Sequence, residues 1–437
     1  MPGDRGGALE EARSDRLYSR HVSSKRFARD GIAFLLTVGI LVVAPTSRAL
    51  GQQGPAMNSF YMNVKPTDGE CCANLTFAMN LPPGRKNPPP ALTMERVSLG
   101  RYVILAEGAA PFPTPSPRGG FFVAVTAISS NAHCFEDSTL VRGFRDLVGV
   151  VRCVDPKGSP IDSQFSWSYR ADSLDFAQLT DMPKNFAYAQ VFPDGKMGTH
   201  FTPVDGGAIT ALRVGPGAFR VKITGLKMSS AAIDPKSGAG VLVSNVCPKA
   251  PCETNVCVPA RWSQASNTST IDIDCSDRTG KAIDNGFRVF LGQEGLNSQS
   301  LGKFKDESDY KKQGQHYNEG TNYGWVNSFD MRPSSGIAPV SDPKIVFVNK
   351  SKDHPGPRKI EYAHPALGRY IVRFKDQLIY GQTYWSMHAT ARETDRGTYC
   401  NIGDIDYHNA EIGVNCFDGT GASRDAKWFM AMRRLYN

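Results

Sequence analysis

Short stretches in which apolar and polar residues alternate recur along the chain from about residue 58 to its end. Ala91–Gly100 reads ALTMERVSLG and Ala208–Gly217 reads AITALRVGPG. A period of two residues turns one face of a strand towards a core and the other towards solvent. Helical periodicity is almost absent. The pattern therefore predicts an all-β chain of short antiparallel strands.

The alternating stretches form three sets that repeat one another. Matching segments begin at Gly100, Gly217 and Gly368 and read GRYVI, GAFRV and GRYIV. The distance between copies is the size of a module, too long for a solenoid. Each set contains six or seven short strands, for which two packed antiparallel sheets are the natural solution. We predict three tandem immunoglobulin-like β-sandwich modules at 58–172, 184–293 and 322–437, with a polar linker at 294–321.

Each set also contains a cysteine followed by one turn motif. The three segments read CVDPKGSPIDSQF, CSDRTGKAIDNGF and CFDGTGASRDAKW and align without a gap. Asp then Gly three residues later is typical of a type I turn. Calcium ligation by the two aspartates is an alternative, but no further acidic residues accompany them. The shared residues are Cys153, Asp155, Gly158, Asp162 and Phe165; Cys275, Asp277, Gly280, Asp284 and Phe287; Cys416, Asp418, Gly421, Asp425 and Trp428.

The ten cysteines favour disulfides, since an even number in an exported chain is typical of a bonded framework. Three of the expected bonds close loops of 16 to 19 residues, and each would stabilise the fold by about 3 kcal/mol. Cys71 and Cys72 are neighbours, and a vicinal bond, bonds elsewhere or a bridge between chains all stay open for them. The expected pairs are Cys134–Cys153, Cys257–Cys275, Cys400–Cys416 and Cys247–Cys252.

The amino terminus has the three parts of a secretory signal. Basic Lys25–Arg29 precedes thirteen uncharged residues, Ile32–Ala44, and small residues follow at Ser47 and Ala49. As a helix the apolar part would cover about 20 Å, less than the ~30 Å of a bilayer core. We therefore predict a signal peptide at 1–49, cleaved after Ala49. An uncleaved anchor is the alternative. Either way the rest of the chain is expected to be secreted or at the cell surface, without another membrane span.

The motifs keep one order in each set. An aromatic strand such as Phe186–Ala189 comes first, then the GRY-type hairpin, a Val125–Ala127 (VTA) strand, a cysteine and the turn motif. This order resembles the tandem repeats of exported, largely uncharacterised proteins of high-GC bacteria. The resemblance implies export and β-structure and brings no catalytic residues. Copy two differs from this common order by its extra pair, Cys247 and Cys252, and copy three reads Trp385–Ala389 in place of the VTA strand.

Net charge and sequence motifs limit the classes of partner and enzyme activity that are expected. The net charge of +8 is modest, and several of its basic residues fall in the predicted signal, so nucleic acid is not an expected partner. Nucleophile-elbow, H-E-x-x-H, Walker and dinucleotide-binding motifs are absent from the sequence. The eight histidines do not recur between copies, and we interpret them as surface or loop residues. No metal site, cofactor or catalytic residue is predicted.

What the copies share is structural, which favours a non-catalytic exported protein with a structural, adhesive or cell-envelope role. Its partner would be an unknown extracellular or cell-surface ligand. The alternative is an array of carbohydrate- or other ligand-binding modules, with tryptophans stacked on sugars. A secreted hydrolase is the third hypothesis, and it requires a pocket that gathers two carboxylates or a histidine with a serine. The candidate stacking residues are Trp167, Trp262, Trp325 and Trp385.

Overall fold

The described part of the chain consists of strands and turns, and it contains no helix. The predicted signal peptide, the linker at 294–321 and Cys71 and Cys72 lie outside it, and no helix within it could cross a membrane. The computed structural model describes residues 58–64, 76–80, 92–106, 119–142, 146–173, 186–202, 206–226, 240–247, 252, 254–292, 322–327, 338–340, 346–348, 359–375, 384–406, 409 and 411–435.

The strands are treated below as three groups in chain order. Group 1 comprises β1 (Asn58–Val64), β2 (Thr76–Asn80), β3 (Leu92–Ser98), β4 (Arg101–Ala106), β5 (Gly119–Ile128), β6 (His133–Arg142), β7 (Asp146–Val154) and β8 (Gln164–Ser173). Group 2 comprises β9 (Phe186–Val191), β10 (Met197–Phe201), β11 (Ala208–Gly215), β12 (Ala218–Thr224), β13 (Gly240–Val246), β14 (Val256–Ala265), β15 (Thr268–Ser276) and β16 (Gly286–Gly292). Group 3 comprises β17 (Asn322–Asn327), β18 (Ala338–Val340), β19 (Val346–Val348), β20 (Lys359–Ala366), β21 (Arg369–Lys375), β22 (Tyr384–Arg392), β23 (Tyr399–Asp406), β24 (Glu411–Phe417) and β25 (Lys427–Leu435).

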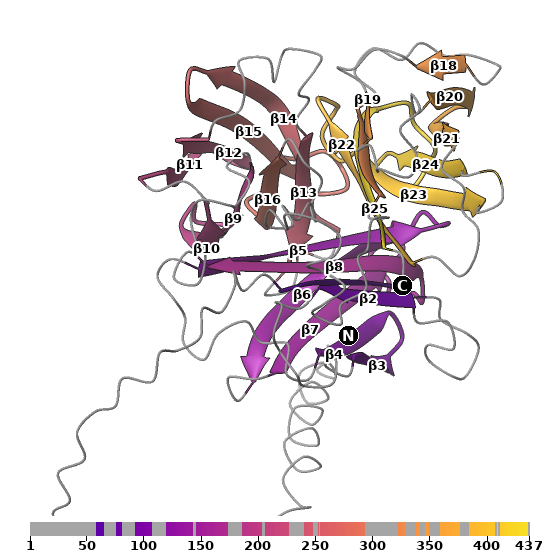
Figure 1. The fold of residues 1–437 in the computed structure, drawn as a ribbon, viewed down its shortest axis with the longest axis horizontal. Helices are drawn as coiled ribbons and strands as arrows, with labels where there is room; N and C mark the ends of the chain where they lie inside the picture. The colour runs from indigo at the N-terminus through magenta and orange to yellow at the C-terminus, as the bar shows by residue number, and fades with distance from the viewer. Residues whose placement is uncertain are drawn as a thin grey trace, which may run out of the picture. The chain divides into compact units, whose positions relative to one another are not determined.

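The same order of antiparallel pairing occurs in every group. One layer runs β2-β1-β8-β5, β10-β9-β16-β13 and β19-β17-β25-β22. The other runs β3-β4-β7-β6, β11-β12-β15-β14 and β20-β21-β24-β23, with β18 added outside β20. Neighbours such as β14 and β15, or β23 and β24, can be followed in Figure 1. An all-β chain built of short antiparallel strands is thus confirmed.

Two sheets continue from one group into another. β6 pairs with β13 in parallel at Glu136 and Val246, and β23 pairs with β5 in parallel at Ile402 and Ile128. A nine-stranded and an eight-stranded sheet result, beside two sheets of four strands. The groups therefore share sheets, and the module boundaries inferred from the sequence stay a prediction.

Alternation along the strands creates a core inside each group. Every second side chain of β4 and β12 is buried, as the two-residue period requires. The aromatic residue twelve positions after the motif cysteine is fully buried in each group: Phe165, Phe287 and Trp428. A further apolar cluster joins all three groups through Phe122, Phe290 and Phe429. The groups thus bury apolar surface against one another as well as internally.

Three disulfides tie neighbouring strands of one sheet. Cys134 and Cys153 face each other across β6 and β7, with 4.1 Å between their Cα atoms. The equivalent bonds are Cys257–Cys275 and Cys400–Cys416, and Cys247, the residue after β13, is bonded to Cys252. These are the four pairs expected from the sequence. Their place within one sheet differs from the antibody domain, whose disulfide joins the two sheets.

Candidate functional site

Three equivalent turns follow Cys153, Cys275 and Cys416, and the first aspartate closes each of them. Its Oδ1 accepts hydrogen bonds of 2.8 to 3.1 Å from the backbone N–H groups two and four residues later. The glycine three residues on has a φ between 81° and 88°, which glycine adopts without strain. These aspartates, Asp155, Asp277 and Asp418, therefore hold the turn together.

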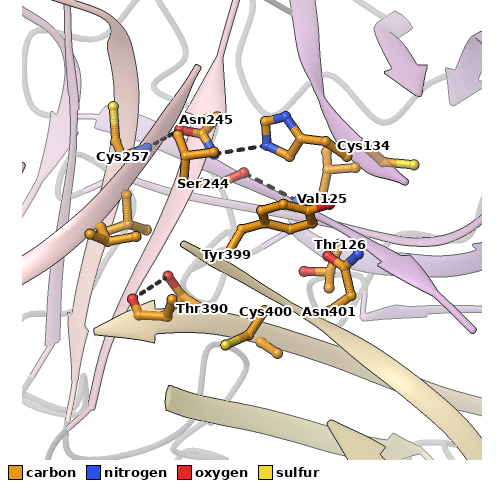
Figure 2. A pocket seen from close by; sticks show the side chains of 16 residues that line it. Val125, Thr126, Cys134, Ser244, Asn245, Cys257, Thr390, Tyr399, Cys400 and Asn401 are labelled. Atoms are coloured by element: carbon orange, nitrogen blue, oxygen red, sulfur yellow. Dashed lines mark hydrogen bonds between the residues drawn. The ribbon is translucent and has the colours of Figure 1, made fainter. Parts of the chain in front are cut away.

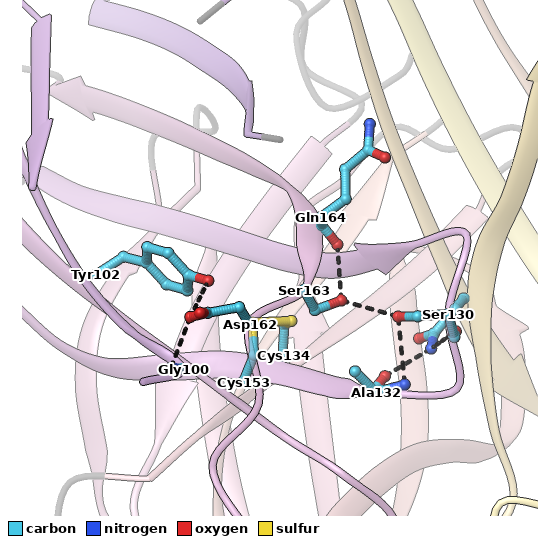
Figure 3. Close-up of a disulfide and its surroundings, with 10 residues drawn as sticks. Gly100, Tyr102, Ser130, Ala132, Cys134, Cys153, Asp162, Ser163 and Gln164 are labelled. Carbon is cyan, nitrogen blue, oxygen red and sulfur yellow. Dashed lines mark hydrogen bonds between the residues drawn. A yellow bond between two sulfur atoms is a disulfide. The ribbon is translucent and has the colours of Figure 1, made fainter. Parts of the chain in front are cut away.

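The second aspartate of each motif ties the turn to the β-hairpin of the same layer. In group 1, Asp162 accepts hydrogen bonds from the Gly100 N–H and the Tyr102 hydroxyl, both at 2.9 Å (Figure 3). Arg96 completes the contact with an ion pair of 2.6 Å. In group 2, Asp284 accepts from the Gly217 N–H and pairs with Arg213 at 2.8 Å, but Phe219 replaces the tyrosine. In group 3, Asp425 accepts from the Gly368 N–H, and its Oδ1 lies 2.8 Å from the His364 Nε2.

These contacts lower the pKa of the Asp162 and Asp284 carboxyl groups. For Asp284 the largest cause is the hydrogen bond from Arg213, which outweighs burial. For Asp162 burial raises the pKa, but the bonds from Arg96, Gly100 and Tyr102 together prevail. Asp162 and Asp284 are therefore ionised near pH 7, and protein donors occupy their oxygens. Within the described ranges, no three His, Cys, Asp or Glu side chains gather as a metal site would require.

The three groups meet through one repeated backbone contact. The N–H that follows strand β5, β13 or β22 donates to a carbonyl of another group. That carbonyl lies two residues after Cys134, Cys257 or Cys400, the first cysteine of the disulfide between adjacent strands. Each of these three hydrogen bonds measures 2.9 Å. They join Cys247 to Glu136 (junction 1–2), Glu393 to Pro259 (junction 2–3) and Ser129 to Ile402 (junction 3–1). The groups are thus linked in cyclic order.

This contact shows which residues of β5, β13 and β22 occupy equivalent positions. The residues three positions before the bonded N–H are Thr126, Ser244 and Thr390. The counterpart of Val125–Ala127 in group 3 is therefore Ala389–Ala391. The sequence alignment that places Trp385–Ala389 there is wrong: its segment ends two residues before Ala391, because it matches residue types without knowing where the strand ends.

Alternation along these strands decides which side chains face the other groups. Val125 and Ala127 belong to the core of group 1, as Ala389 and Ala391 belong to that of group 3. Successive side chains of a strand point to opposite faces. Thr126 and its counterparts Ser244 and Thr390 therefore turn away from the cores of their own groups.

These residues line a cavity of about 30 Å³ where strands of all three groups meet. Figure 2 shows Thr126, Ser244 and Thr390 on three different strands around it. The Ser244 hydroxyl accepts a hydrogen bond of 3.2 Å from the Val125 N–H, and the Thr390 hydroxyl donates to the Ala391 carbonyl at 3.3 Å. A smaller hollow of about 10 Å³ lies beside it and shares His133, Val256 and Tyr399 with the cavity wall.

Junction 3–1 contains a buried histidine between two hydroxyl groups. The Nε2 atom of His388 lies 2.6 Å from the Ser168 Oγ, and its Nδ1 atom lies 3.1 Å from the Thr126 Oγ1. Burial lowers the pKa of His388 to about 3, so the ring is neutral near pH 7. A neutral histidine beside a serine is the arrangement of an activated nucleophile. Here, however, the exposed fractions of Ser168 and His388 are only 2% and 1%.

Junction 1–2 contains a buried ion pair. Arg288 of β16 donates to both carboxylate oxygens of Glu136 in β6, at 2.6 and 2.8 Å. It also donates to the Phe121 carbonyl and the Thr199 hydroxyl, and its guanidinium lies 4.4 Å from the centre of the Phe121 ring. Both charged side chains are at most 2% exposed. The charges are therefore fully paired at the contact between groups 1 and 2.

The candidate stacking tryptophans do not form a shared surface among the described side chains. Trp167 is fully buried in the core of group 1. Trp262 is partly buried and packs against the core of group 2. The side chains of Trp325 and Trp385 lie outside the described residues, although β17 and β22 place their backbones.

Sequence reasoning missed the polar residues of the junctions. The interpretation of the histidines as surface or loop residues is wrong for His133 and His388, because their exposed fractions are 9% and 1%. In the corrected alignment, the apolar residues Ala124 and Leu242 are the counterparts of His388. A polar residue where the other copies are apolar is the signal that could have revealed it.

No family model matches this chain, and neither a curated protein nor a solved structure matches it. Inferences about its function therefore depend on the sequence and the geometry described above.

Proposed function

We propose that this chain is a non-catalytic exported protein with a structural, adhesive or cell-envelope role. In this proposal its three strand groups are immunoglobulin-like modules closed in cyclic order, and the ligand is an extracellular or cell-surface molecule. The observation that supports it most directly is that the polar side chains shared by the three groups bind the protein's own backbone. In every group both motif aspartates bind backbone N–H groups of their own scaffold.

The equivalent junctions support the cyclic arrangement. Three bonds of the same length join groups 1 and 2, 2 and 3, and 3 and 1. Contacts that repeat in this way use equivalent positions of each group at the junctions. Loops at the free ends of β-sandwiches are where such modules usually make their contacts. The four disulfides indicate folding in an oxidising environment.

The hydrolase alternative is tested at Ser168 and His388, where a serine and a histidine do come together. A fluorophosphonate probe reacts with an activated serine, whose Oγ bonds to phosphorus as fluoride leaves. We expect no labelling of the native mature chain, because both side chains are buried. Labelling of Ser168 that is lost in His388→Ala would overturn the non-catalytic proposal. A known serine hydrolase, labelled in parallel, controls for the probe.

Carbohydrate binding is tested on a glycan array. Trp262 is the candidate with a described and partly accessible side chain, so Trp262→Ala is the informative variant. We expect no glycan to bind the native chain in a way that depends on this residue. Saturable binding that is lost in Trp262→Ala, while the variant keeps native circular dichroism, would favour the carbohydrate-binding alternative.

Export is tested separately from binding. Residues 1–57 are fused to alkaline phosphatase, which is active only where its disulfides form, and we expect activity in an export-competent bacterial host. Mass spectrometry of the exported, non-reduced chain should place the new amino terminus after Ala49. Retention of residues 1–49 on the exported chain would favour the anchor instead, and an inactive fusion would contradict export.

A further inference from the structure

The cavity where the three groups meet is lined by one hydroxyl residue from each group. Thr126, Ser244 and Thr390 occupy equivalent positions of β5, β13 and β22, and all are at most 5% exposed. Three buried residues, one from each group, therefore place a hydroxyl group at one small pocket (Figure 2). Buried polar groups in proteins are almost always hydrogen-bonded, to protein or to ordered water.

The size of the cavity limits what can occupy it. Its volume is about 30 Å³, and one water molecule needs roughly 10–15 Å³ on this measure. There is room for about two water molecules and none for a sugar, a nucleotide or an amino acid. A divalent metal ion would require carboxylate, histidine or thiolate ligands in a cluster, and the described residues contain no such cluster.

The hydrogen-bonding capacity of the wall fits water. Among the described residues, the Ser244 hydroxyl has one protein partner, the Val125 N–H, to which it is the acceptor. Its own proton is thus available to the cavity. Thr390 donates its proton to a carbonyl, which leaves the oxygen free to accept. Asn401 and Asn245 line the same wall, but their amide nitrogens already contact protein groups, the Ser130 and Ala132 carbonyls and the His133 ring, so the hydroxyl groups are the main partners for water. A water molecule needs two to four such partners.

We propose that this cavity is a binding site for one or two ordered water molecules, which join the three strand groups through Ser244, Thr390 and Thr126. The water would accept from the Ser244 hydroxyl and donate to the threonine oxygens. Each group then contributes one contact to a shared, buried solvent cluster. This site is independent of whatever the exterior of the protein binds.

The direct test is a crystal structure of the mature chain at about 1.5 Å resolution or better. We expect one or two density peaks, each within roughly 2.7–3.2 Å of Ser244 Oγ and of at least one threonine oxygen. A dry cavity would overturn the proposal. So would xenon bound there under pressure, which indicates an apolar site, or an ion, identified by anomalous scattering after exchange into bromide or rubidium salts.

A solution measurement on variants provides the second test. Magnetic relaxation dispersion counts long-lived internal water molecules, and Thr390→Val removes one hydroxyl at almost constant volume. We expect Thr390→Val and Ser244→Ala each to lose at least one such water. Thr210→Val, on the exposed face of β11, is the matched control and should lose none. An unchanged water count in both cavity variants, with native circular dichroism, would contradict the proposal.

Discussion

At the scale of single residues, the glycine at each hairpin tip is fixed by the approach of another strand. A Cβ atom at Gly100, Gly217 or Gly368 would lie 2.3 to 2.5 Å from the carbonyl oxygen of the motif cysteine. The same glycines have φ values of 64° to 66°, where other residues are strained. The N–H of each of these glycines also binds the second motif aspartate. Two features of the repeat therefore depend on one another.

Gly217→Ala should lower the free energy of unfolding by about 3 kcal/mol, through backbone strain and the displaced Cys275 carbonyl. The matched control is Gly215→Ala, two residues away, where a Cβ atom has no neighbour within 4 Å and φ is not positive. The control should change the stability by less than about 1 kcal/mol. Urea unfolding followed by fluorescence measures both, and equal effects would contradict the packing argument.

Asp284 should make stability depend on pH in the acid range. Its pKa is lowered in the folded state by the Arg213 hydrogen bond, so the unfolded chain takes up a proton first as pH falls. The stabilisation is present above the unfolded value of about 3.9 and is lost as pH falls through the lower folded pKa. Wild type and Asp284→Asn should therefore differ in unfolding free energy at pH 6 and converge towards pH 2. A difference that is constant across this range would count against the ion pair as its cause.

At the scale of elements, a disulfide joins two adjacent strands in each group. Cys257 and Cys275 face each other in the β14–β15 hairpin and are separated by 18 residues. Cys247 and Cys252 are separated by only 5. The longer loop restricts the unfolded chain more when it is closed.

Replacing both Cys257 and Cys275 by Ala should cost about 3 kcal/mol, and replacing both Cys247 and Cys252 about 2 kcal/mol, on the loop-entropy relation. Thermal unfolding of the two double variants, compared with wild type, measures the order of the effects. The reverse order would indicate that the short loop contributes mainly by its contacts with Phe135 and Val154.

At the scale of the whole molecule, the junctions are alike in backbone and different in chemistry. Junction 1–2 is closed by the Glu136–Arg288 ion pair and junction 3–1 by His388 with Ser168. At junction 2–3, Val256 and Val258 pack into the core of group 3. A group placed at a wrong junction would leave a charge or a histidine without its partner, which is costly in a buried site. Unlike junctions therefore favour one order of the groups.

Arg288→Met should destabilise the protein by about 3–5 kcal/mol, because it leaves the Glu136 carboxylate buried without its partner. The double variant Glu136→Gln with Arg288→Met removes both charges and should recover much of that loss. Arg220→Met is the control: it breaks the exposed pair with Asp272 and should cost less than about 1 kcal/mol. Denaturant unfolding of wild type and the three variants measures these differences, and a double variant no more stable than Arg288→Met would contradict the charge argument.

The sequence determined the strands, the turns and the disulfides, because these follow from local information. Alternation predicts a strand, Asp and Gly three apart predict the turn, and each bonded cysteine pair lies within 19 residues. The sequence alignment also identified the aspartates that the turns use. It did not reveal that Asp162 would meet Gly100, because that contact depends on the packing of a hairpin against a distant turn.

Only the tertiary structure decided how the three groups join. Glu136 and Arg288 are 152 residues apart, and Ser168 and His388 are 220 apart, so no local pattern links them. The cavity lined by Thr126, Ser244 and Thr390 likewise exists only where strands of three groups converge. Local patterns specify each strand and turn, whereas the junctions arise from long-range burial of surfaces that look ordinary in the sequence.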